Sequence, residues 1–243
     1  MQWTRRSRLG YIALAVGGSL LMSAVSLIRM REPMRDWSEF GETPEPKAAI
    51  ESGDLQAALS GFATRELLGY RMHGRGHSDV WISGFGVAQW LMGDTFGAAR
   101  VWSRVCEEAL KGRYAYSSTG TFQGGLLLWF ASVWLKDEDW HDEAAALFDK
   151  LLRKRQPVMG AGFPSLLARL LRQEVDLPKV QAACNNEAYE RMALFYAGVR
   201  ASEAGDREAT RQLWMQTKTP TYSQCEFEYY LLAHERKNLG VRG

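Results

Sequence analysis

A stretch of nine residues, RMHGRGHSD at positions 71–79, gathers side chains that can do chemistry. Imidazole nitrogens bind metal ions and guanidinium groups bind anions, and the stretch supplies both kinds of group: Arg71, His73, Arg75 and His77. His73 and His77 stand four residues apart, as zinc-binding pairs on helices do, but the two glycines between them disfavour a helix. We therefore expect a solvated loop here, and a loop that binds a metal or an anion is the alternative.

The remaining sequence carries no spacing typical of a catalytic or metal centre. The three cysteines, Cys106, Cys184 and Cys225, are far apart and form no CxxC pair, which argues against a zinc site. Adjacent acids such as Glu107 and Glu108 point in different directions on a helix and cannot act together. No cofactor is expected, and an enzyme is the less favoured class of protein.

The elements that would position this loop are helices. Residues 78–111 predict two amphipathic helices joined by a tight turn, in which Gly93 ends the first helix. The Asp94 carboxylate should cap the second helix by accepting a backbone N–H group. Apolar residues then recur at spacings of three and four, at Ala98, Val101, Trp102, Val105, Ala109 and Leu110. One helix pair cannot bury such faces alone, so further pairs are expected.

The pattern of this pair recurs along the chain. It consists of a small residue, a turn seven residues later, a small residue about five after the turn and an aromatic nine after it. The two clear copies have Gly86, Gly93, Asp94, Ala98 and Trp102, and Gly198, Gly205, Asp206, Ala209 and Trp214. Weaker copies have Ser132, Asp139, Ala144 and Phe148; Gly53, Asp54, Ala58 and Phe62; and Ala168, Val175 and Asp176. Residues 229–240 predict one last helix.

This pattern resembles the tetratricopeptide repeat, whose helices cross at small residues and wedge together at an aromatic. The turns fall 30 to 46 residues apart, against a period of about 34 in regular repeats. The resemblance covers residues 47–243 and implies an all-α fold, an α-solenoid built from helix pairs. The uncharged run at 126–135 is too short to span a bilayer and predicts a buried core helix.

The resemblance also implies a concave face lined by the first helix of each pair. Counting back from each turn places there Trp90, Trp129, Lys136, Arg169, Arg172, Tyr230 and His234. This face would be aromatic toward its N-terminal half and basic toward its C-terminal half, which suits an acidic peptide or a C-terminal carboxylate. For Trp90 and Trp129 we favour packing in the core over contact with a partner.

An uncharged run of twenty residues occupies positions 9–28, between arginines on both sides. As a helix it would be roughly 30 Å long, the thickness of a bilayer core. We expect residues 1–35 to form a single-pass membrane anchor, with residues 36–46 as a linker rich in proline and acidic residues. The alternatives are a signal peptide, cleaved near Ala24-Val25-Ser26 before export, and a buried helix.

The charge of the chain is unevenly distributed. Residues 1–35 carry six arginines and one acid, a balance of +5, whereas the rest has 24 basic and 27 acidic residues, a balance of −3. A mildly acidic body argues against nucleic acid as a partner. With 243 residues, 46% of them hydrophobic, the chain is long enough to bury a substantial core.

Three hypotheses for the function follow. The leading one is a helical-repeat scaffold, tethered to a membrane or exported, that binds a protein or a peptide. The second, from another class, is an enzyme or a metal-binding or anion-binding protein that uses the loop at 71–79. The third is a protein that neutralises a toxin.

Overall fold

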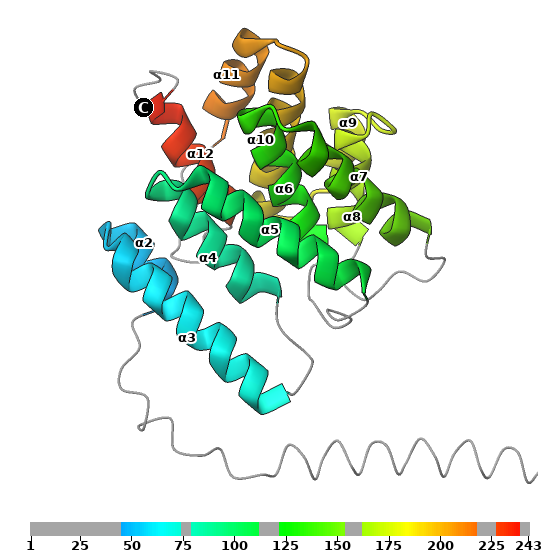
Figure 1. Cartoon of the computed structure of the whole chain (residues 1–243). Helices are drawn as coiled ribbons and strands as arrows, with labels where there is room; N and C mark the ends of the chain where they lie inside the picture. The colour runs from blue at the N-terminus through cyan, green and yellow to red at the C-terminus, as the bar shows by residue number, and fades with distance from the viewer. Residues whose placement is uncertain (1–44, 74–78, 112–121, 154–161, 218–226, 239–243) are drawn as a thin grey trace, which may run out of the picture. The chain divides into compact units, whose positions relative to one another are not determined.

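The computed structural model describes residues 45–73, 79–111, 122–153, 162–217 and 227–238. The chain divides into two compact units, Met1–Thr43 and Pro44–Gly243, and every described residue lies in the second unit. The described residues form eleven helices and no strand, which confirms the predicted all-α class (Figure 1). The turn at 93 is also confirmed, because α4 (Asp79–Leu91) and α5 (Thr95–Leu110) meet there.

Aspartate caps set the start of the second helix in several pairs. The Asp94 Oδ1 accepts the Gly97 N–H at 2.9 Å, and Gly93 has φ of 90°, which favours glycine. The same cap begins α3 (Leu55–His73) at Asp54, after α2 (Pro46–Ser52), and it begins α11 (Arg207–Met215) at Asp206, after α10 (Glu187–Glu203). Local sequence therefore fixes these turns.

The third turn lies earlier than predicted. Its expected position was Asp139, but α6 (Phe122–Leu135) ends before Lys136, and α7 (Glu138–Arg153) already includes Asp139. The cap is Asp137, whose Oδ1 accepts the Trp140 N–H at 3.0 Å. Lys136 takes the left-handed conformation with φ of 56°, so the turn forms without the glycine that marks the turns at 53, 93 and 205.

Two helix pairs share one crossing geometry. In α4–α5 the Trp102 indole donates to the Ser83 carbonyl at 3.1 Å, and in α10–α11 the Trp214 indole donates to the Phe195 carbonyl at 3.0 Å. Each ring lies against a glycine of the facing helix, Gly86 or Gly198, where an added Cβ would clash with the ring. The small residue and the aromatic of the repeat pattern therefore meet in space, as predicted.

The weak copy contains α8 (Gly162–Leu171) and α9 (Leu177–Gln181), and α9 has only five residues. The turn predicted at Val175 and Asp176 is present, and the Asp176 Oδ1 caps α9 by accepting the Lys179 N–H at 3.2 Å. The last helix, α12 (Phe227–Asn238), begins and ends two residues before the predicted range.

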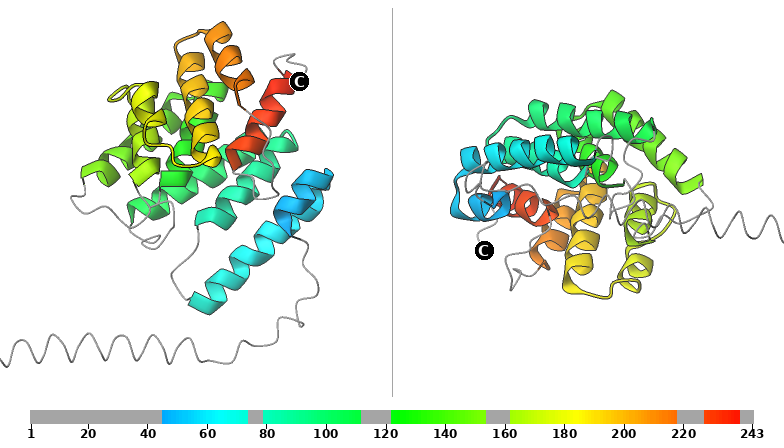
Figure 2. Two further views of the ribbon diagram at one scale, coloured as in Figure 1. Left: turned by 180° about the vertical axis from the view of Figure 1, so that it is seen from behind. Right: turned by 90° about the horizontal axis from the view of Figure 1, so that it is seen from below.

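Helix α6 lies at the centre of the unit, as its uncharged run predicted. Its residues from Phe122 to Ser132 are all buried, and it contacts α4, α5, α7, α8 and α10. Helix α12 also returns to the interior, where it contacts α4, α10 and α11 (Figure 2). The last helix of the chain therefore packs against helices that begin up to about 150 residues earlier.

Candidate binding surface

The stretch at 71–79, predicted to be a loop, is described only at its two ends. Helix α3 includes Arg71 to His73, so these residues are helical rather than part of a loop. Asp79 already begins α4, and Arg75 and His77 lie outside the described residues. In the part of the chain that the structure describes, no three His, Cys, Asp or Glu residues come together as a metal site would require.

Trp90 lies in the core, as favoured from its sequence. It is 1% exposed, and its ring is 4.8 Å from the Phe130 ring and 5.8 Å from the Trp102 ring, measured between centroids. Its indole N–H donates to the Glu235 carboxylate of α12 at 2.7 Å. Trp90 therefore faces the last helix of its own chain.

Trp129 is also buried, at 4% exposure, and stacks on Phe148 at 5.6 Å between ring centroids. Its indole donates to the Glu203 Oε2 at 3.3 Å, and His141 Nε2 lies 3.0 Å from the other oxygen of the same carboxylate. The cluster joins α6, α7 and α10. Packing in the core, rather than an open contact surface, is again confirmed for the tryptophan.

The two predicted arginines belong to an ion-pair network. Arg169 Nη1 lies 2.7 Å from the Glu174 carboxylate, and Arg172 Nε lies 2.8 Å from the same group. Arg172 also pairs with Asp149 of α7. Both guanidinium groups stay partly exposed, so an acidic partner could reach them only in competition with these carboxylates.

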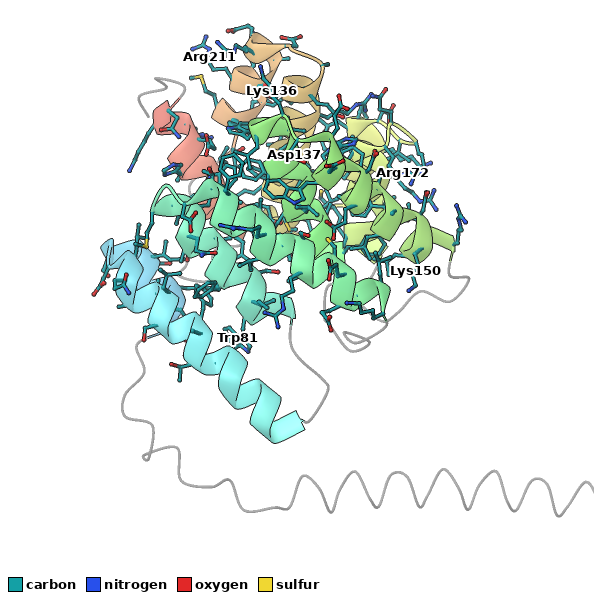
Figure 3. The ribbon with its side chains drawn as sticks, in the orientation of Figure 1. Trp81, Lys136, Asp137, Lys150, Arg172 and Arg211 are labelled. Atoms are coloured by element: carbon teal, nitrogen blue, oxygen red, sulfur yellow. The ribbon has the colours of Figure 1, made fainter. Side chains whose placement is uncertain are left out.

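The three other predicted residues lie in different places. Lys136 is exposed at the α6–α7 turn, away from Arg172 at the end of α8 (Figure 3). Tyr230 is 5% exposed, and its hydroxyl donates to the Glu51 carboxylate at 3.1 Å. His234 is partly buried on α12. The seven predicted residues thus do not share one open face.

Sequence reasoning missed two buried carboxylates, Glu228 and Glu235, on α12. The Glu228 Oε1 accepts hydrogen bonds from Gln123 Nε2 at 2.9 Å and from the Tyr196 hydroxyl at 2.8 Å. The Glu235 carboxylate accepts from the indoles of Trp90 and Trp134. The signal available in the sequence was a pair of glutamates seven residues apart in an otherwise apolar segment, FEYYLLAHE.

These contacts define the candidate site, an inner surface of α4, α6 and α10 that faces α12. We call it the inner face. Neutral donors of three described helices bond to the two carboxylates: Trp90 of α4, Gln123 and Trp134 of α6, and Tyr196 of α10. Buried carboxylates need such donors, because an unsatisfied buried charge is costly. The inner face therefore has the chemistry to bind a helix that presents two carboxylates to it.

Tyr196 predicts a measurable dependence of stability on alkaline pH. Burial raises the pKa of its phenol well above the usual value, and the Glu228 carboxylate raises it further. The stability linked to this group is present below about pH 10, the pKa in an unfolded chain, and is lost as the pH rises toward the folded-state pKa. We expect Tyr196→Phe to flatten the decline in unfolding free energy above about pH 10, measured by urea denaturation.

A residual decline in that variant is expected from Cys106, because burial also raises the pKa of its thiol and Glu143 adds to the effect. The comparison is therefore between slopes rather than between a slope and a plateau. Identical slopes for the wild type and Tyr196→Phe would contradict the buried position of the phenol.

Compared with protein-family models, with curated proteins and with solved structures, the chain matches none. None of the described helices is long and apolar enough to cross a membrane. The predicted anchor at 9–28 lies outside the described residues. The inner face and the repeated helix pairs are therefore the features of the chain that bear on its function.

Proposed function

We propose that this protein is a helical-repeat scaffold that binds a segment of a partner protein. Residues 9–28 would anchor it in a membrane, or direct its export as a signal peptide. The helix pairs would form a solenoid similar to tetratricopeptide repeats, in which first helices line one face and second helices the other. Support for the repeat comes from the matched crossings of α4–α5 and α10–α11.

One observation carries the proposal of binding. Three first helices, α4, α6 and α10, already hold α12, because their side-chain donors bond to its two buried carboxylates. Recognition of an amphipathic helix by a surface with apolar contacts and a few placed polar groups is a common mode of protein–protein interaction. The inner face shows that mode within one chain.

The direct test is covalent capture by the full chain in its own membranes. A photo-crosslinking amino acid would replace Phe96, which is 58% exposed, or in a second variant Met215, which is 53% exposed. We expect one discrete partner, and the purified partner should then bind the purified chain in calorimetry. If no captured protein binds the purified chain, the protein is not a scaffold of this kind.

Charge reversal at the basic end tests one part of the contact surface. We expect Arg169→Glu with Arg172→Glu to weaken binding of the captured partner by about tenfold or more, since charge-assisted hydrogen bonds are the stronger ones. The matched control is Arg211→Glu, which reverses an exposed arginine paired with Glu208. Equal affinities of the double variant and the control, at unchanged melting temperature, would remove the basic end from the interface.

The membrane anchor gives a separate prediction. Deletion of residues 1–35 should move the protein from the membrane fraction to the supernatant and leave its helical content unchanged, because the described core lies wholly within Pro44–Gly243. Fractionation and circular dichroism measure the two effects. A full-length, uncleaved chain that already stays in the supernatant would contradict the anchor.

A further inference from the structure

Helix α12 is bound by parts of the chain that are far apart in sequence. Beyond its contacts with α4, α10 and α11, the Tyr230 hydroxyl reaches Glu51 of α2. The Phe227 ring meets Phe62 of α3 edge-on, at 6.0 Å between centroids. On the remaining side of α12, Lys237 is exposed, whereas Tyr229, Ala233 and Arg236 are partly buried. Helix α12 is therefore buried on most of its circumference.

Glu235 fixes one end of this helix. Its Oε1 accepts the Trp90 indole N–H at 2.7 Å, and its Oε2 accepts the Trp134 indole N–H at 2.9 Å. The residue is 4% exposed. Both indole donors are neutral and come from two different helices, and Asn238 of α12 itself also donates to Oε2, at 3.3 Å. A side chain without two acceptor oxygens could not replace this arrangement.

Glu228 fixes the other end. It is 2% exposed, and one oxygen accepts from both Gln123 and Tyr196. The two glutamates are seven residues apart, or about two helical turns, and therefore lie on the same side of α12. Between them, Leu231 and Leu232 are buried. The inner face thus recognises a defined pattern on α12: two carboxylates two turns apart, with leucines between them.

Stability alone does not require this pattern. Well-packed apolar side chains usually stabilise an interior at least as well as buried charges, because each charge must lose its water. Buried polar groups instead specify which segment binds and in which register. They also make the docking of α12 weaker than it would be if the carboxylates and their donors were all replaced by well-packed apolar groups. Both properties suit a site whose occupant is exchanged.

We propose that the inner face is a receptor for a helix of a partner protein that presents two buried carboxylates, and that α12 occupies it until such a helix replaces it. The partner helix carries two carboxylates seven residues apart, flanking apolar residues, as α12 does. This inference rests on the proposed scaffold function and names the chemistry of the partner. The apparent affinity for a partner is then the intrinsic affinity multiplied by the fraction of chains in which α12 is not docked.

The test uses the full chain and a capped, fluorescent peptide that copies residues 227–238. In one chain variant, Glu228→Gln and Glu235→Gln weaken the resident helix. We expect this variant to bind the peptide at least about tenfold more tightly than the wild-type chain does, because its internal competitor is weaker. A peptide carrying the same two substitutions should lose about tenfold or more in affinity, whereas a Lys237→Gln peptide should not. Fluorescence anisotropy gives all four affinities.

Each outcome decides the question. Equal binding of the original and the doubly substituted peptide overturns the recognition of carboxylates. If the variant forms a dimer that the peptide cannot dissociate, the inner face binds α12 of a second copy of the chain. That outcome overturns the proposal of a partner helix. If the variant does not fold alone, addition of the peptide should restore a cooperative melting transition. A variant that stays unfolded with the peptide present overturns the proposal.

Hydrogen exchange on the wild-type chain gives an independent measurement. Backbone amides of α12 should exchange through local opening, at least about tenfold faster than those of the central helix α6. Equal protection of α12 and α6 would mean that α12 leaves only on global unfolding, which overturns the exchange of occupants. Failure of these tests would leave capture of a partner through Phe96 or Met215 untouched, so the scaffold function is judged separately.

Discussion

Alanine at Gly198 is expected to destabilise the domain by about 1–3 kcal/mol, because the new methyl group would overlap the Trp214 ring. The ring cannot move aside, since Trp214 is 1% exposed and its indole is bonded to the Phe195 carbonyl. Gly86→Ala should have a similar effect, because its Cβ would lie 2.5 Å from the Trp102 Nε1. Urea denaturation measures both losses.

The control for these variants is Gly162→Ala, where no atom of the described residues outside the neighbouring backbone lies within 4 Å of the added Cβ. Alanine should be neutral there, or stabilise the helix by up to about 1 kcal/mol. A second control is the double variant Gly198→Ala with Trp214→Phe. The smaller ring should recover part of the loss caused by the methyl group, as a coupling between neighbours. Additive effects of the two substitutions would contradict the close contact between the Gly198 position and the Trp214 ring.

Leucine at Glu235 should have the other large effect. It would leave the indole N–H groups of Trp90 and Trp134 without their acceptor, at a cost of about 1–3 kcal/mol for the buried Trp90 donor and less for the partly buried Trp134 donor. We expect the midpoint of urea denaturation to fall accordingly. The matched control is Glu208→Leu on α11, where the carboxylate is exposed and the change should stay within about 0.5 kcal/mol.

Removing the donors as well should restore part of the lost stability. In the triple variant Glu235→Leu, Trp90→Phe, Trp134→Phe, the interior contains neither the carboxylate nor the unsatisfied N–H groups. It should therefore be more stable than expected from the three single losses added together. A triple variant at or below that sum would show that the carboxylate contributes little beyond its volume.

Much of the fold was predictable, because turns and helix pairs depend on nearby residues. Asp94 and Asp206 act as caps where the sequence placed them, and the aromatic rings of both clear copies meet their glycines. The turn at 139 was wrong because the repeat pattern was aligned on Phe148, whereas the cap of α7 is Asp137. A lysine in the left-handed conformation leaves no glycine to mark that turn.

The inner face was much harder to predict. The register placed Trp90 and Tyr230 on one concave surface, but their environment depends on where α12 packs. That position follows from contacts between residues far apart in the chain, for which local periodicity carries no information. The glutamates of α12 also resemble ordinary solvated charges when read in sequence. Only the fold shows that both carboxylates are buried.

The position of α12 also affects how the protein is made. Trp90 and Glu235 are separated by 145 residues, so at about 5–20 residues per second the ribosome adds Glu235 roughly 7–30 s after Trp90. Throughout that interval the nascent chain lacks the helix that covers its aromatic interior. In an open array of repeats, each unit could fold as it emerges. Here, completion of the core waits until α12 has been translated, and a premature stop codon after α11 would act as a core mutation.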